Sequence, residues 1–444
     1  MSKRSDVARL EKISSALREA ALATLIVAGL GFPIIAYRAE PDFNNALALL
    51  GRWPLFFQFC LAAFALRFAL AFWRGGAAKA PIRERLWRSP RWLGPAALIA
   101  LVVYPLAVVG LLGPQAALKW VDTYGVQILI YVLLGWGLNI TVGLAGLLDL
   151  GYAAFYAVGA YAYALLAPAT GLGFWALLPV CGLLAAFWGF CIGFPILRLR
   201  GDYLAIVTLA FAEIVRIVLT NWDVVTHGEA GLFGFPGLNF FGLPFIPGPR
   251  GFAAHAGLPF AGVHKLIFLY YLVLILALAA NLVSLRLRRL PLGRAWEALR
   301  EDEIACRALG LDTANIKLTA FALGAFFAGV AGCLFALRQG FVSPSAFTFS
   351  ESALILAIVV LGGGGSQLGV AVAAVFLVGA SEALREITFL KSVFGEGFDP
   401  AQYRMLLVGL AMVAMMNLRP RGLVSTREPT IKLPAGKIAA ETAS

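Results

Sequence analysis

The sequence predicts an all-α protein, a polytopic bundle of transmembrane helices. Of its 444 residues, 61% are hydrophobic and 14% are charged, whereas a soluble domain carries about 25% charged residues. A bilayer offers no water to unpaired backbone groups, so only helices and closed barrels cross it. The apolar runs are long and continuous, unlike the alternating strands of a barrel. A bundle of helices is therefore the expected architecture.

Apolar runs that could cross a bilayer recur along the whole chain. A crossing helix needs roughly 20 apolar residues, and by that measure we expect about 12 spans, within a range of about 10–12. One of them, 352–361, is short. The expected spans are residues 20–36, 53–73, 94–112, 126–143, 152–167, 174–197, 203–220, 266–285, 317–337, 352–361, 369–385 and 403–418.

Positive charge sets the expected orientation. Lys and Arg gather in the cytoplasmic loops of membrane proteins, which accounts for the net charge of +12, so we expect no nucleic acid partner. With the N-terminus inside, the basic linker 74–92, the segment 286–318, Arg419 and Arg421 all lie in the cytoplasm. Both termini are therefore expected to be cytoplasmic. The loops expected on the outer side are 37–52, 113–124, 221–265 and 339–350.

The chain changes character near residue 120. Glycine becomes frequent from there on, and the apolar runs lie closer together. We expect an accessory N-terminal hydrophobic domain at 1–120 with about three spans, a transport core at 121–420 and a cytoplasmic tail at 421–444.

The longest charged stretch between apolar runs is residues 286–318, which we call the charged island. Its arginines alternate with Glu297, Glu301 and other acids, while apolar residues recur at helical spacing. This pattern predicts an amphipathic helix outside the bilayer, and Gly310 is placed to end it. A short helix held between two spans can contact a soluble partner.

Ionisable side chains inside spans are costly, so they are candidates for function. Glu213 and Arg216 lie three residues apart in the span 203–220, where they can pair on one helix face. The pair either lines a pathway or is a structural ion pair near a helix end. Thr208 lies in the same span, and Asn139 and Thr141 in 126–143 predict hydrogen bonds between helices or a pore lining.

Two glycine-rich segments interrupt the apolar runs, 143–151 and 362–369, the second including Gly363 and Gly364. Interrupted spans often border the path of a transporter. Tight turns and close helix packing explain the glycines equally well.

Several motifs of catalysis are absent from the sequence. There is no GxxxxGK[ST] segment, so we expect no ATP hydrolysis by this chain. The three histidines lack metal-ligand spacing, and no CxxC pair occurs among the five cysteines. We expect neither a cofactor nor a catalytic residue, and hence a protein that is not an enzyme.

Part of the charged island resembles the cytoplasmic loop of ABC importer permeases. Ala305, Cys306, Arg307 and Gly310 match its Glu-Ala-Ala-x-x-x-Gly pattern, although Ile304 replaces the usual Glu and the downstream Leu-Pro is missing. The resemblance is closer to the branched-chain amino acid subfamily of LivM type. The stretches that carry it are 137–166, 198–222, 231–238, 293–325 and 359–374.

This resemblance implies the ABC importer permease fold and a place in the bacterial inner membrane, among membrane lipid. It implies three kinds of partner: a second permease of LivH type, two cytoplasmic ATP-binding subunits and an extracytoplasmic amino acid binding protein. ATP hydrolysis would reside in the ATP-binding subunits, which dock on the loop 293–318. The residues implied in this coupling are Glu297, Arg300, Glu301, Asp302, Ala305, Arg307 and Gly310.

The implied cargo is leucine, isoleucine or valine. Permeases for urea and short amides look similar, so such a substrate remains an alternative. An ion-coupled secondary transporter is a different class; it needs intramembrane acids for ion coupling, and it leaves the charged island unexplained.

Overall fold

The computed structural model describes residues 93–196, 201–240, 243–245, 262–386, 404–418 and 422–423, together with 37–41, 47–51 and scattered residues before 66. The chain divides into two compact units, Met1–Ala96 and Ala97–Ser444.

The first unit contains a β-hairpin where we expected a plain loop. Strand β1 (Tyr37–Pro41) pairs antiparallel with β2 (Leu47–Gly51), and Tyr37 lies opposite Gly51. Only scattered residues of the expected spans 20–36 and 53–73 are described. Those two spans, and the boundary near residue 120, stay predictions.

The second unit is a bundle of helices, which confirms the expected all-α membrane architecture. Seven described segments are long and apolar enough to cross a bilayer, and the segments 98–111 and 367–383 are shorter apolar helices. The expected count of about 12 is not confirmed. The helices are α3 (Leu93–Lys119), η2 (Trp120–Gln127), α4 (Ile128–Leu138), η3 (Asn139–Leu144), α5 (Tyr152–Thr170), α6 (Phe174–Ile196), α7 (Asp202–Asn221), α10 (Gly262–Arg289), α11 (Pro291–Glu301), α12 (Glu303–Ala308), α13 (Thr313–Gln339), α14 (Phe349–Gly362), α15 (Gln367–Glu386) and α17 (Arg404–Leu418).

The expectation of an outer loop at 113–124 is wrong, because this segment is helical. The chain turns only at Gly113, whose φ of 80° and ψ of 166° interrupt α3. Pro114 follows, and proline suits the first turn of a helix because it has no N–H to leave unpaired. The next span then runs without a gap over Ala117–Leu144. The polar residues 122–124 are thus placed inside a helix.

Helix α13 is central in the second unit and packs against α4, α5 and α6. Glycines bring its backbone close to that of α5: a Cβ on Gly332, or on Gly159 of α5, would overlap the main chain of the other helix. A Cβ on Gly329 would lie 2.6 Å from the carbonyl oxygen of Cys181 in α6. Small residues allow such close approach between membrane helices, where dispersion replaces the hydrophobic effect as the source of stability.

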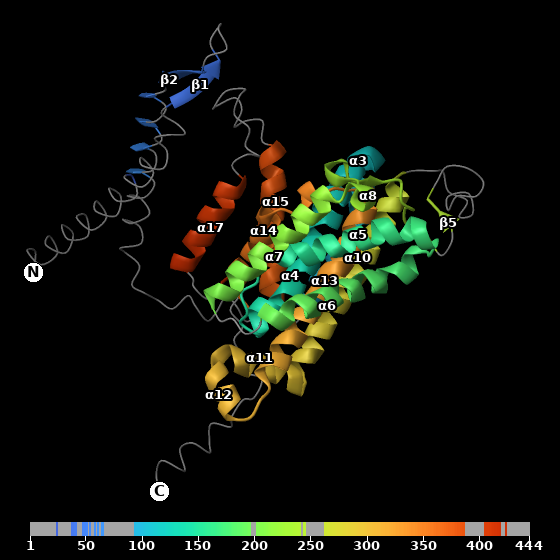
Figure 1. The fold of residues 1–444 in the computed structure, drawn as a ribbon. Helices are drawn as coiled ribbons and strands as arrows, with labels where there is room; N and C mark the ends of the chain where they lie inside the picture. Colours follow the sequence, from blue (N-terminus) through green and yellow to red (C-terminus); the bar gives the residue numbers. More distant parts are fainter. Residues whose placement is uncertain are drawn as a thin grey trace, which may run out of the picture. The chain divides into compact units, whose positions relative to one another are not determined.

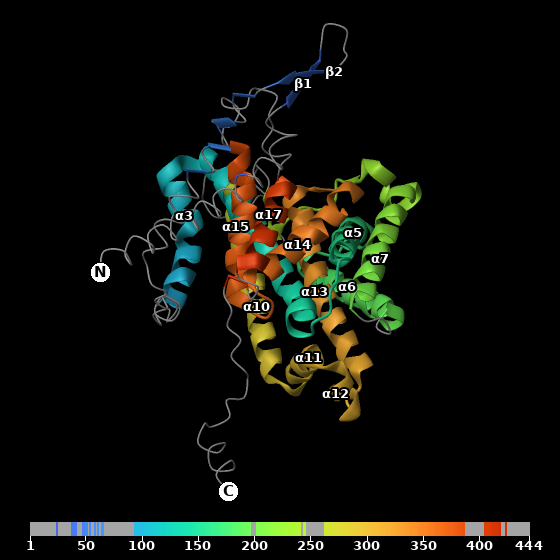
Figure 2. The same ribbon diagram turned by 90° about the vertical axis from the view of Figure 1, so that its left-hand side faces the viewer.

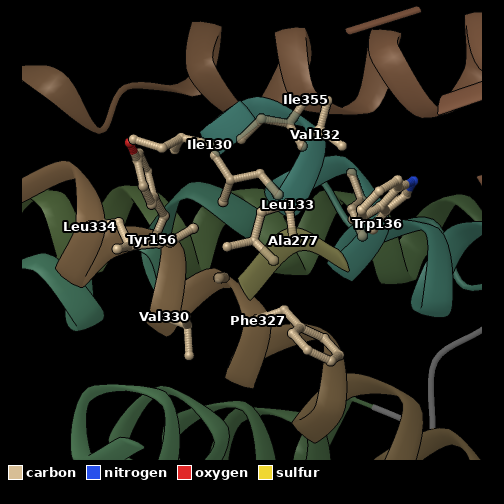
Figure 3. Close-up of a cluster of buried hydrophobic side chains, with 14 of the residues drawn as sticks. Ile130, Val132, Leu133, Trp136, Tyr156, Ala277, Phe327, Val330, Leu334 and Ile355 are labelled. Carbon is tan, nitrogen blue, oxygen red and sulfur yellow. The ribbon is translucent and has the colours of Figure 1, made fainter. Parts of the chain in front are cut away.

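A cluster of buried apolar side chains surrounds this contact (Figure 3). It contains Leu133 of α4, Ala277 of α10 and Phe327 of α13, which lie against one another. Buried residues of α5, α6, α14 and α15 belong to the same cluster, so these helices share one core with α4, α10 and α13.

The connections lie at two ends of the bundle. Figures 1 and 2 both place α11 and α12 beyond the ends of α10 and α13. Helix α13 is about 40 Å long at 1.5 Å per residue, so its C-terminal end lies far from α11 and α12. That end leads into β6 (Phe341–Val342), which pairs antiparallel with β3 (Leu232–Phe233). The expected outer loops 221–265 and 339–350 therefore meet at the end opposite the charged island.

We predict that Gly159→Ala destabilises the bundle. The added methyl group meets the backbone of α13, which cannot move aside as a side chain could, and overpacking of this kind costs about 1–3 kcal/mol. The measurement is the thermal unfolding midpoint of the full chain in detergent. The matched control is Gly379→Ala in α15, where the added Cβ would lie an ordinary 3.8 Å from Ile128. Equal midpoints for the two variants would contradict the close-packing account.

Candidate functional site

The charged island folds into two short helices rather than the single helix we expected. Residue Asp302 interrupts it with an extended backbone, at φ −156° and ψ 108°. Its carboxylate accepts hydrogen bonds from the backbone N–H groups of Ile304 at 2.8 Å and Ala305 at 3.1 Å. An aspartate in this position caps the start of a helix. The expectation of one helix is wrong because Asp302 ends α11 and begins α12.

The end of α12 is at Gly310, as the sequence predicts. Gly310 has a φ of 79°, a conformation that costs other residues energy. Its N–H donates to the Arg307 carbonyl at 3.0 Å, and the N–H of Leu311 donates to the Cys306 carbonyl at 3.0 Å. This pair of bonds is the Schellman arrangement, which satisfies the last carbonyls of the helix.

Helix α11 is anchored to the bundle by Trp296. The indole is fully buried, and its Nε1–H donates to the Ile316 carbonyl of α13 at 3.0 Å. Arg288 at the end of α10 pairs with Glu297 across 2.5 Å. A buried aromatic ring with a satisfied N–H is a rigid attachment, so α11 is held to both neighbouring spans.

Helix α12 is anchored by Glu303. This carboxylate accepts from the Nζ of Lys317 at 2.9 Å and from Arg307 at 2.6 Å. The Lys317 side chain is only 3% exposed, and leaving such a charge without its partner is strongly destabilising. The bond between Glu303 and Lys317 therefore fastens α12 to the start of α13.

Helix α12 and the residues that follow it nonetheless expose apolar side chains. Ile304 is 67% exposed, Leu309 81% and Leu311 39%. They lie beside the exposed acids Glu301 and Asp302. Exposed apolar side chains near acids, in a segment between the candidate spans Gly262–Arg289 and Thr313–Gln339, are typical of a protein–protein contact.

Arg300 connects α11 to the first glycine-rich segment. Its guanidinium donates a hydrogen bond to the carbonyl oxygen of Gly143. A Cβ on Gly146 would lie 2.8 Å from the Arg300 Cγ, and one on Gly365 would lie 3.7 Å from its Nη1. The side chain of Arg300 thus lies where the two glycine-rich segments approach each other.

The two glycine-rich segments are joined by Asn139. Its Oδ1 accepts the backbone N–H of Gly365 at 2.8 Å, across 226 residues of sequence. The Asn139 side chain is completely buried. A Cβ on Gly364 would lie 3.4 Å from the Cα of Gly143, so the two turns are in direct backbone contact. Close packing of the two turns therefore explains why glycine occupies position 143.

Gly363 contacts the last described residues of the chain. A Cβ on Gly422 would overlap the backbone of Gly363. The N–H of Leu423 donates to the Leu361 carbonyl at 2.8 Å. The turn between α14 and α15 is consequently covered on one side by residues 422–423.

Thr208 ties α7 to the first glycine-rich segment. Its Oγ1 accepts the N–H of Leu150 at 3.1 Å. The neighbouring Asp149 carboxyl is 1% exposed and accepts the Gly151 N–H at 2.8 Å. Burial raises the pKa of Asp149 to about 6, and the Gly151 bond offsets only part of that rise. Sequence analysis did not include Asp149 among its candidate residues.

The other expected pathway residues lie apart from this contact or serve packing. Glu213 and Arg216 form an ion pair on α7, with Nε of Arg216 3.0 Å from both carboxylate oxygens. Their side chains are 43% and 31% exposed, so this chain alone does not enclose them. Thr141 donates to the Leu138 carbonyl at 2.9 Å, and its methyl group packs on Gly324 of α13.

A polar cavity of about 290 Å³ lies at the other end of α13. Its charged lining residues are Arg338, Glu351 and Glu382, none of which was predicted from the sequence as a site residue. Glu382 lies inside the expected span 369–385. The rule that ionisable side chains inside spans are candidates for function therefore applies to Glu382 as well as to Glu213. Across the described parts of the chain, no three His, Cys, Asp or Glu side chains gather as metal ligands would.

Comparison with known proteins identifies two segments. The family described as the permease component of branched-chain amino acid transport systems matches residues 121–416. A family described only as a domain of unknown function matches residues 15–104. No solved structure matches this chain.

Three relatives illustrate the similarity. The high-affinity branched-chain amino acid transport system permease protein LivM of Escherichia coli K12 is 52% identical over 320 residues, 71% of this chain and 72% of its own. A probable LivM of Methanocaldococcus jannaschii is 28% identical over 277 residues, 61% of this chain and 73% of its own. The permease protein LivH of Escherichia coli K12 is 23% identical over 307 residues, 67% of this chain and 92% of its own. The chain therefore belongs to the family of permease components of branched-chain amino acid transport systems.

Proposed function

We propose that this chain is one of two membrane-spanning subunits of an ATP-binding cassette importer for leucine, isoleucine and valine in the bacterial inner membrane. The observation that carries the proposal is the path of contacts from the exposed tip of α12 to both glycine-rich segments. Family membership supplies the substrate class, and the path supplies a mechanism. The chain itself hydrolyses no ATP, since that reaction belongs to partner subunits.

The exposed face of α11 and α12 docks on a cytoplasmic ATP-binding subunit. Ile304, Leu309 and Leu311 enter an apolar groove of that partner, and Glu301 and Asp302 meet its rim. Their exposure outside the spans supports this docking, because exposed apolar patches mark contact surfaces. A LivH-type subunit presents the matching surface to a second ATP-binding subunit.

Motion of the docked helices reaches the glycine-rich segments through Arg300. Closing the ATP-binding pair displaces α11, and the bond from Arg300 to Gly143 transfers this displacement. Asn139, Thr208, Gly363 and Gly364 belong to the same contact and form the cytoplasmic gate. Two discrete packings of these turns provide the bistable element that coupling requires.

The opposite end receives the substrate. The loops that carry β3 and β6 lie there and face an extracytoplasmic amino acid binding protein. Both termini are cytoplasmic in this orientation, and residues 1–120 form the accessory domain. The similarity of this core to LivH proteins supports a paired subunit of the same fold. That subunit covers the exposed face of α7, so Glu213 and Arg216 lie at the subunit boundary.

We predict that Leu309→Asp abolishes docking. A charge in the centre of an apolar contact has to be desolvated without a partner, which costs several kcal/mol. The measurement is affinity purification of the full chain from gently solubilised membranes, with quantification of the recovered ATP-binding subunits. Recovery should fall at least tenfold, while the second permease remains. The control is Val224→Asp, which changes a residue that is 89% exposed near the other end of the bundle. Wild-type recovery from Leu309→Asp would refute docking through α12.

We predict that Asn139→Ala makes the gate leak. The variant removes the bond to the Gly365 N–H, and such bonds contribute about 0.5–1.5 kcal/mol, which raises the open population by roughly twofold to tenfold. Efflux of labelled leucine from loaded proteoliposomes without ATP measures the leak. Asn221→Ala, at the exposed end of α7, is the control. Efflux from the Asn139 variant at the wild-type rate would mean that this bond does not hold the gate.

A further inference from the structure

The polar cavity is lined by residues of η2, α4, α5, α13, α14 and α15. Arg338 and Lys317 mark the two ends of α13, and their separation of 21 positions corresponds to about 32 Å at 1.5 Å per residue. The hydrocarbon core of a bilayer is about 30 Å thick. The cavity therefore opens in the outer part of the bundle, far from the contact of the two glycine-rich segments.

Arg338 supplies positive charge to this cavity. Its Nε donates to Asp122 at 2.8 Å, and its Nη2 donates to Asp122 at 2.9 Å and to Gln127 at 3.2 Å. These bonds use three of the five N–H groups of a guanidinium. The side chain is 12% exposed. The two N–H groups on Nη1 can still donate to a carboxylate, and the contacts with η2 hold them in place.

Two carboxylates face the cavity from other helices. Glu351 of α14 accepts a 2.7 Å hydrogen bond from the hydroxyl of Tyr131 in α4. Glu382 of α15 is 7% exposed. Acids at this depth are expensive to bury and are found where a transporter handles its cargo. The cavity thus offers both signs of charge on separate helices.

The remaining wall is aromatic. Tyr156 of α5 and Phe335 of α13 line the cavity, with ring centroids 5.3 Å apart. Figure 3 shows that Tyr156 turns its hydroxyl away from Leu133 and Ala277 of the apolar cluster. These rings provide an apolar surface of the kind that receives an aliphatic side chain.

We propose that this cavity binds the free amino acid as a zwitterion before it passes the gate. The ammonium group donates to Glu351 and Glu382, the carboxylate accepts from Nη1 of Arg338, and the aliphatic side chain packs on Tyr156 and Phe335. The volume of about 290 Å³ is near the lower limit of about 300 Å³ for small-molecule sites. This assignment rests on the proposed import of amino acids, and it makes the permease itself a selective element.

The test is equilibrium binding of radiolabelled L-leucine to the full permease assembly in lipid nanodiscs, without the binding protein or ATP. Two competitors each lack one charge: 3-methylbutylamine has no carboxylate, and 4-methylpentanoate has no amine. We expect each to compete at least tenfold more weakly than unlabelled leucine. Because these comparisons use the wild-type protein, they do not depend on the folding of any variant.

Variants then assign each charge. Glu382→Gln and Glu351→Gln should weaken leucine binding at least tenfold and leave the affinity for 4-methylpentanoate within twofold of wild type. Arg338→Gln should also weaken leucine binding at least tenfold, but it should leave the affinity for 3-methylbutylamine within twofold of wild type. The control is Glu229→Gln, which alters an exposed acid in the loop after α7 and should bind as wild type.

The outcomes separate this inference from the proposed function. Leucine uptake by the complete importer, with no leucine binding to the permease assembly, would overturn the cavity site and leave the proposed function standing. Equal competition by the two single-charge analogues and leucine would also overturn it, as would wild-type affinity in the Glu382 and Arg338 variants. Absence of leucine uptake by the complete wild-type importer would instead refute the proposed function.

Discussion

The close approach of α13 to α5 and α6 is the constraint on which the rest of the second unit depends. Glycines bring the backbones of these helices into contact, and side chains of ordinary size would force them apart. The same helix carries Lys317 at one end and Arg338 at the other. A rigidly packed α13 therefore fixes the island of short helices and the polar cavity relative to each other.

Because the centre of the bundle is closely packed, a change of conformation is easier at the glycine-rich turns than in the core. There the contacts are a few hydrogen bonds between backbone and side chain, such as Asn139 to Gly365 and Arg300 to Gly143. Each contributes little free energy by itself. Trp296 and Glu303 attach α11 and α12 to the first turns of α13. These short helices are therefore joined to the bundle both through α13 and through the bond from Arg300 to Gly143.

Sequence patterns predicted the parts of this structure that depend on local chemistry. Apolar runs predicted the helical membrane architecture, and Gly310 was identified as a helix end. The division of the charged island at Asp302 escaped prediction, because one side chain capping two N–H groups outweighed the helical periodicity around it. The segment 113–124 was wrongly predicted to be a loop because several of its residues are polar. One of them, Asp122, instead accepts a hydrogen bond from Arg338, 216 residues away in the sequence.

The candidate site depends on long-range contacts, so only part of it could be predicted. Asn139, Thr208, Gly363 and Gly364 were selected from separate stretches, but no local pattern shows that Arg300 and Asn139 bring those stretches together. Glu382 lay within an expected span and was overlooked. Arg338 and Glu351 lay at the edges of spans, where charges are ordinary, and only the fold brings all three to one cavity.

We propose that Arg300 transmits the movement of the docked helices to the gate. The most direct measurement is the number of leucine molecules imported per ATP hydrolysed, in proteoliposomes that contain the complete importer with Arg300→Gln. Arg294→Gln, an exposed arginine on the same helix, provides the comparison. The account predicts that Arg300→Gln keeps its ATP hydrolysis while import per ATP falls at least tenfold. An unchanged ratio would contradict it and would require another route from α11 to the glycine-rich segments.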